Sequence, residues 1–126
     1  MVTELARHLE RTGDTVVRQR LAEIHTVDFL IRKVAQRGDD LRAASGADRG
    51  AEGSILKLLG SRQNFRLAAL AAELLGPRFA ADTEEWGTYT WSRFLVGAPA
   101  MRIAGGTDEI QHNILGERVL GLPREP

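Results

Sequence analysis

The residues best placed to bind a ligand form a glycine turn near the end of the chain. Gly105, Gly106 and Thr107 are followed directly by Asp108 and Glu109. Free backbone N–H groups and a hydroxyl at a helix start can hold a phosphate, a carbonyl oxygen or a hydroxyl-rich cofactor. A plain helix start has the same composition, with a threonine N-cap and acidic residues on the positive end of the helix dipole. The turn alone therefore leaves both interpretations open.

Other residue types that carry chemistry are present without a matching arrangement. His8, His25 and His112 lack metal-ligand spacing and have no accompanying carboxylate cluster, so no metal site is predicted. The chain has no cysteine, which excludes disulfides, thiolate nucleophiles and Cys-ligated zinc. No serine lies in a GxSxG context, which argues against a serine hydrolase. Scattered arginines are typical of solvated helix faces: Arg62, Arg66, Arg78 and Arg102.

The overall composition is that of one globular domain, residues 1–126, with 43% hydrophobic and 27% charged residues. Basic and acidic residues each number 17, so no net positive charge exists to attract nucleic acid. The first ten residues contain no apolar run, so neither a signal peptide nor a membrane span is predicted. The cytoplasm is the default expectation.

Apolar residues spaced by threes and fours predict four helices, over about 14–37, 54–76, 83–97 and 107–120. Asp14 is a good N-cap for the first helix, which we expect to end near Gly38. Gly38 to Gly53 is expected to be a solvated loop, and Gly76 with Pro77 to end the second helix. No alternating strand pattern is present, so the predicted fold class is all-α, an up-down four-helix bundle.

The third and fourth predicted helices have different signals. Asp82 and Glu85 resemble a capping pair before a short helix that should stop ahead of Pro99. The aromatic residues on this helix have the spacing of a core more often than of a pocket wall: Trp86, Tyr89, Trp91 and Phe94. Thr107 should cap the last helix, which Gly121 should end.

Several segments together resemble the C-terminal domain of the acyl-CoA dehydrogenase family, a four-helix bundle. The segments that carry the resemblance are Arg102 to Gln111, Gly116 to Pro126, Val16 to Ala22, Glu52 to Leu58 and Glu73 to Gly76. The resemblance implies an FAD-dependent α,β-dehydrogenation of an acyl-CoA thioester to the trans-2-enoyl-CoA. It also implies a homo- or hetero-oligomer of dehydrogenase subunits and an electron-transfer acceptor. This chain looks like the last part of such an enzyme and is expected to be inactive alone.

The same resemblance assigns roles to particular residues. Gly105 and Gly106 are placed beside the substrate thioester, where a backbone N–H helps to hold its carbonyl. Thr107, Asp108 and Glu109 are placed against FAD. Glu73 and Gly76 align with a stretch that usually reads Gln-x-x-Gly-Gly and meets a neighbouring subunit's FAD. Here Glu73 replaces the glutamine and Pro77 replaces the second glycine, which adds charge and removes a backbone donor.

Gly105 also occupies the position where many family members carry the catalytic glutamate, so no catalytic residue is assigned in this chain. Some members carry the base on a preceding helix, and others are catalytically silent partner subunits. Asp108 and Glu109 are better explained as residues at a helix start than as the base. Two alternatives stay open beside the dehydrogenase: a non-catalytic partner subunit that keeps only the bundle, and an isolated bundle with an unrelated role.

Overall fold

The computed structural model describes residues 1–46 and 51–124 and contains only helices and their connections within them. The elements are α1 (Val2–His8), α2 (Thr15–Ser45), α3 (Ala51–Leu75), the 3-10 helix η1 (Gly76–Ala80), α4 (Thr88–Ile103) and α5 (Asp108–Leu120). The prediction of an all-α fold is confirmed. The short first helix was not predicted, because its few apolar residues do not form a long periodic stripe.

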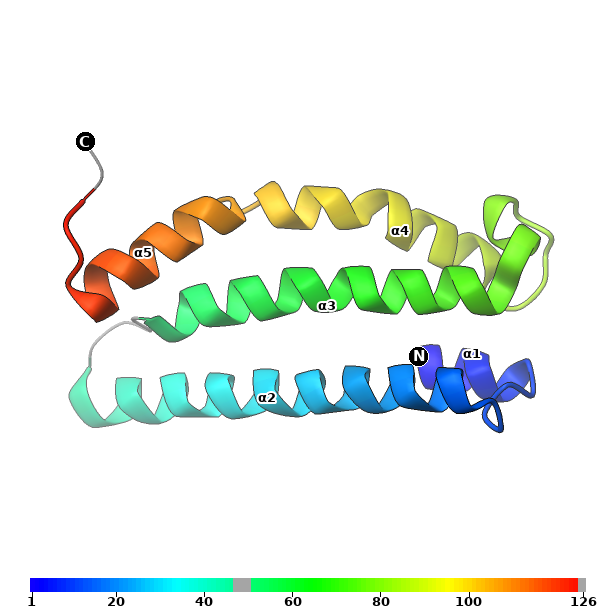
Figure 1. The fold of residues 1–126 in the computed structure, drawn as a ribbon, viewed down its shortest axis with the longest axis horizontal. Coiled ribbons are helices and arrows are strands. Elements are labelled where there is room, and N and C mark those ends of the chain that lie inside the picture. Colours follow the sequence, from blue (N-terminus) through cyan, green and yellow to red (C-terminus); the bar gives the residue numbers. More distant parts are fainter. Residues whose placement is uncertain (47–50, 125–126) are drawn as a thin grey trace.

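The helices lie in three layers with α3 in the middle (Figure 1). α1 and α2 lie on one side of α3, and α4 and α5 follow one another along the other side. The chain reverses direction from α2 to α3 and again from α3 to α4, which is the predicted up-down order. α5 then continues in the direction of α4, and the connection between them interrupts what would otherwise be one long helical layer.

The hydrophobic core lies at the end of the molecule where α1, the start of α2, the end of α3 and the start of α4 meet. Its buried members are Val2, Leu5, Ala6, Val17, Leu21, Ile24, Leu70, Ala71, Leu74, Leu75 and Trp91. Trp91 has only 1% of its surface exposed, and its ring meets the edge of Phe94 at a centroid distance of 5.7 Å. The α4–α5 connection lies away from this core, towards the other end of α3 (Figure 1).

α2 begins where the sequence predicts and continues through Gly38, where we expected its end. Asp14 caps the helix, because its Oδ1 accepts hydrogen bonds from the N–H groups of Val16 (2.9 Å) and Val17 (3.3 Å). Gly38 is buried inside the helix, and the left-handed cap is instead Gly46, with φ +67°. A glycine inside a helix costs about 1 kcal/mol relative to alanine, which the surrounding helix can absorb. Part of the predicted 38–53 loop is therefore helix, and residues 47–50 of it lie outside the described residues.

α4 begins later and ends later than predicted. The Oδ1 of Asp82 accepts from the N–H of Glu84 at 3.0 Å, so the residue forms a local turn and caps no helix. The N-cap is Gly87, which has φ +87°. Pro99 lies inside α4, where its missing N–H leaves a carbonyl one turn earlier without a partner. Pro99 is on the exposed side of the helix, where water can satisfy that carbonyl.

Replacing Gly60 with alanine is expected to raise stability. Gly60 lies inside α3, and a Cβ built on it meets nothing within 4 Å. The alanine should stabilise the helix by about 0.5–1 kcal/mol, because it lowers the backbone entropy lost on folding. A higher urea midpoint at unchanged slope would show this, and a lower midpoint would contradict it.

Candidate functional site

The predicted turn is present and joins α4 to α5. Gly105 and Gly106 have φ values of +73° and +99°, a region that residues with a Cβ rarely adopt. The N–H of Gly106 donates to the carbonyl of Ile103 at 3.2 Å, so it is used within the turn. No acceptor for the N–H of Gly105 is found in the described part of the chain. Of the two glycines predicted to hold a thioester carbonyl, Gly105 is therefore the one with a donor to offer.

Thr107 is the N-cap of α5, as predicted. Its hydroxyl oxygen accepts from the N–H of Ile110 at 3.5 Å. Hydrogen bonds from the Glu109 N–H and from the Thr107 hydroxyl lower the pKa of the exposed Glu109 carboxyl. Thr107 and Glu109 thus have the roles expected of residues at a helix start. That either residue also contacts a ligand stays a prediction.

Asp108 is the buried member of the predicted group. Its Oδ2 accepts two hydrogen bonds from Arg102, from Nε at 3.0 Å and from Nη2 at 2.6 Å. These bonds hold the pKa of Asp108 below its ordinary value, and the charges of Lys57 and Arg62 act in the same direction. Asp108 is therefore ionised and paired inside the fold.

Two further side chains fix the same turn. The Nζ of Lys57, on α3, donates to the carbonyl of Arg102 at 3.2 Å. The Nε2 of Gln111, on α5, donates to the carbonyl of Gly105 at 2.9 Å. α3 thus binds the last turn of α4, and α5 binds the turn itself through Gln111.

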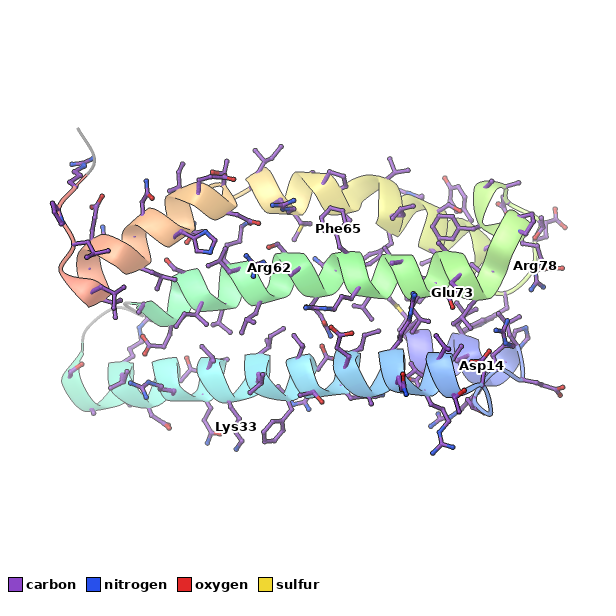
Figure 2. All side chains as sticks on the ribbon, viewed as in Figure 1. Asp14, Lys33, Arg62, Phe65, Glu73 and Arg78 are labelled. Atoms are coloured by element: carbon purple, nitrogen blue, oxygen red, sulfur yellow. The ribbon has the colours of Figure 1, made fainter. Side chains whose placement is uncertain are left out.

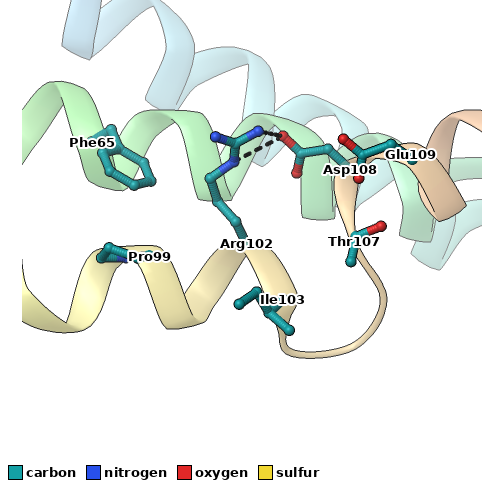
Figure 3. A pocket seen from close by; sticks show the side chains of 7 residues that line it. All are labelled: Phe65, Pro99, Arg102, Ile103, Thr107, Asp108 and Glu109. Atoms are coloured by element: carbon teal, nitrogen blue, oxygen red, sulfur yellow. Dashed lines mark hydrogen bonds and ion pairs between the residues drawn. The ribbon is translucent and has the colours of Figure 1, made fainter.

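A pocket of about 280 Å³ opens beside this turn (Figure 3). It is lined by Phe65, Pro99, Arg102, Ile103, Thr107, Asp108 and Glu109. The guanidinium of Arg102 lies between the Phe65 ring and the Asp108 carboxylate, 5.9 Å from the ring centroid. The pocket brings the three predicted cofactor residues together with an apolar wall and one cation, a composition found in ligand sites.

Glu73 lies far from the turn, near the other end of α3 (Figure 2), and Gly76 directly follows the last residue of that helix. The carboxylate of Glu73 pairs with Arg20 of α2 at 2.5 Å. Gly76 takes the left-handed conformation, with φ +57°, and begins η1 as the predicted helix stop. Glu73 thus has a partner within the chain, and the predicted cofactor contact of both residues stays a prediction.

Four residues around the turn were not predicted to belong to the site: Arg102, which was assigned to a solvated helix face, Lys57, Phe65 and Gln111. Arg102 and Lys57 are separated by much of the chain, and only the packing of α4 on α3 brings them together. One signal was available in the sequence. A cation at the end of one helix and an acid at the start of the next are joined by a short turn, which allows an ion pair across the connection.

Two other kinds of site are absent from the described residues. No group of three or more His, Cys, Asp or Glu side chains is arranged to hold a metal ion there. Among the same residues, no helix is both long and apolar enough to cross a membrane.

The sequence of this chain matches a known protein family. Residues 3–120 match the family described as acyl-CoA dehydrogenase, C-terminal domain. Acyl-CoA dehydrogenase IpdE1 of Mycolicibacterium smegmatis is 33% identical over 125 residues, which are 98% of this chain and 30% of that protein. The protein of the same name from Mycobacterium tuberculosis is 33% identical over 98% of this chain and 31% of its own length.

A third relative is more distant. Acyl-CoA dehydrogenase FadE34 of Mycobacterium tuberculosis is 32% identical over 96 residues, which are 76% of this chain and 12% of that protein. The chain thus spans less than a third of the length of these curated relatives. No solved structure gives a match.

Proposed function

Because this chain belongs to the acyl-CoA dehydrogenase C-terminal domain family, we propose that it works inside an FAD-dependent acyl-CoA dehydrogenase. In this proposal the chain supplies contacts to the flavin, to the acyl-CoA thioester and to neighbouring subunits. The family match over residues 3–120, which includes the turn and its pocket, carries the proposal. The reaction is the α,β-dehydrogenation of a thioester to the trans-2-enoyl-CoA, with an electron-transfer acceptor downstream and the cytoplasm as compartment.

The residue types at the turn suit contacts with the substrate and with the flavin. Gly105 offers a backbone N–H, which would donate to the thioester carbonyl and stabilise negative charge that develops on its oxygen. Thr107, Asp108 and Glu109 line the pocket and would contact the flavin there. Glu73 and Gly76 would contact a neighbouring subunit's flavin. Bound FAD would supply the hydride acceptor.

The catalytic base must come from outside this turn. A base that removes a C–H proton needs a pKa near the working pH. Asp108 is held ionised by Arg102, and the pKa of Glu109 is lowered by its own N–H and Thr107. Gly105, at the usual position of the glutamate, has no side chain and a φ of +73°. Neither carboxylate is suited to the role.

This last observation favours a second candidate function. The chain could instead belong to a non-catalytic partner subunit that pairs with a catalytic one and completes its flavin site. Both candidates keep the bundle and the turn, and they differ in where the base lies. Turnover by the complete protein without any other subunit would exclude the second candidate.

Replacing Thr107 with valine tests the proposed cofactor contact. In the complete protein or complex, T107V should weaken flavin binding about fivefold to tenfold, because a lost hydrogen bond is worth about 1–1.5 kcal/mol. The measurement is flavin released per protein after extensive dialysis. The matched control is T26V, since the Thr26 hydroxyl also makes a local hydrogen bond within a helix. It donates to the Ala22 carbonyl at 2.8 Å. Equal flavin content and turnover in both variants would count against the contact.

A further inference from the structure

The connection between α4 and α5 combines two adjacent glycines with an ion pair that spans them. Only residues 104–107 separate the two helices, and Gly105 and Gly106 among them have positive φ values. Glycine has more backbone freedom than any other residue, so this sequence does not hold one geometry by itself. The turn must therefore be fixed by contacts from outside it.

The Arg102–Asp108 pair spans the turn. Arg102 lies one residue before the end of α4 and Asp108 is the first residue of α5. Two N–H groups of the guanidinium donate to a single carboxylate oxygen, so the pair joins the last turn of α4 to the first residue of α5. Lys57 adds a hydrogen bond from α3 to the carbonyl of Arg102, which ties the pair to the central helix.

Burial makes this pair more consequential than the exposed ion pairs of the described residues. The Asp108 side chain is 7% exposed and its partner Arg102 is 50% exposed, whereas both partners of the Met1–Glu4 pair are more than half exposed. The Oδ1 of Asp108 is buried and has no hydrogen-bond partner in the described part of the chain. Without Arg102, the carboxylate would be buried with no hydrogen bond from a cation, which is strongly unfavourable. Exposed pairs contribute little by comparison.

We propose that Arg102 and Asp108 are a positioning pair that holds the Gly105 N–H in its productive place. This inference rests on the proposed function, in which that N–H receives the thioester carbonyl. In this role neither side chain contacts the thioester. Their effect is to prevent the turn from sampling other conformations, and a displacement of about 1 Å at a reacting centre can cost about 100-fold in rate.

The experiment uses the complete protein or complex with four variants: R102Q, R102K, D108N and R102Q/D108N. The matched control is R32Q, since Arg32 is an exposed arginine of α2 remote from the turn. Hydrogen exchange of the peptide covering residues 104–110 reports the turn directly, without any need for activity. Turnover is measured by dye reduction with butyryl-CoA, octanoyl-CoA and palmitoyl-CoA as probe substrates.

We expect faster exchange at residues 104–110 in R102Q and D108N than in R32Q. We also expect kcat to fall about tenfold or more while KM changes less than about threefold, because a transition-state contact is lost. The double variant should be no worse than the single ones, since the two residues act as a unit. R102K should recover part of the lost kcat.

Unchanged exchange in the turn would overturn the inference. Faster exchange with an unchanged kcat in a protein that turns over would also overturn it, since the pair would then only stabilise the fold. A wild-type protein with no flavin and no turnover would contradict the proposed function instead. Faster exchange of the turn in R102Q would then show only that the pair fixes the turn. The two failures are thus distinguishable.

Discussion

Replacing Gly106 with alanine is expected to lower turnover of the complete enzyme about 100-fold and to reduce its flavin content. A Cβ on Gly106 would lie 2.7 Å from the Nε2 of Gln111 and 3.4 Å from the Cγ2 of Ile110. Nε2 is the far end of a flexible side chain, so Gln111 can move away at little steric cost, and the loss is that of its hydrogen bond to Gly105, about 0.5–1.5 kcal/mol. The φ of +99° adds strain, about 1–2 kcal/mol for a residue with a Cβ in left-handed backbone.

The loss of function follows from the hydrogen bond that the new methyl group breaks. Gln111 can avoid the new methyl group only by moving, and its Nε2 donates to the carbonyl of Gly105. The turn therefore loses one of its hydrogen bonds at the residue that offers the free N–H. A shift of about 1 Å there is enough for the predicted loss of rate.

Two other glycines provide controls for G106A. Gly46 has φ +67° and a Cβ placed on it would meet nothing within 4 Å, so G46A introduces backbone strain far from the turn. Gly105 has φ +73° and equally open space, so G105A adds strain at the turn without the clash. We expect G46A to lower stability with normal turnover per folded protein, and G105A to have an effect between the two. Normal flavin content and turnover in G106A would contradict the role given to the turn.

Replacing Trp91 with alanine is expected to have the largest effect on stability, a loss of about 3–5 kcal/mol. Trp91 is the largest fully buried side chain, and it packs where α1, α2, α3 and α4 meet. Its removal leaves a cavity that the surrounding helices cannot fill without moving. It also removes the edge contact with Phe94, and such aromatic pairs add about 0.5–1.5 kcal/mol.

Trp86 is the matched control for Trp91. It is the other tryptophan of the chain, it is 51% exposed, and its ring contacts only His8 among the described aromatic residues, at a centroid distance of 5.3 Å. Urea unfolding followed by far-UV circular dichroism should show a small loss for W86A, under about 1 kcal/mol. Comparable losses for W86A and W91A would contradict the assignment of the core.

The sequence predicts the parts of this fold that depend on local chemistry. Asp14 and Thr107 cap helices because their side chains accept hydrogen bonds from the backbone two or three residues ahead, which the local sequence decides. Gly76 and Gly121 take left-handed backbone at helix ends for a similarly local reason. Periodic apolar stripes of α2 and α3 follow from the need to bury one face of each helix.

Tertiary contacts decided the features that were not predicted. Gly38 is typical of a helix end, yet it is buried inside α2, which continues to its cap residue Gly46. Pro99 also reads as a stop, yet α4 continues past it with its proline on the exposed side. Glycine and proline weaken a helix by a few kcal/mol at most, and packing can exceed that amount. A sequence pattern shows the glycine or proline, but it does not show the packing energy that opposes its effect on the helix.

The site was predicted in part for the same reasons. The turn and its acidic residues are contiguous, so the sequence identifies them together. The part played by Arg102 was not predicted, because it depends on lying opposite Asp108 across the turn and beside Phe65 and Lys57 of α3. The roles of Glu73 and Gly76 require a neighbouring subunit, so they stay predictions.

The absorption spectrum of the complete protein, purified from its native host with its partners, tests the central claim most directly. We predict flavin bands in the visible region that bleach when an acyl-CoA substrate is added. We also predict that G106A lowers the flavin bands relative to G46A. A folded protein that carries no flavin and gives no bleaching with any acyl-CoA would contradict the claim that this chain works in an acyl-CoA dehydrogenase.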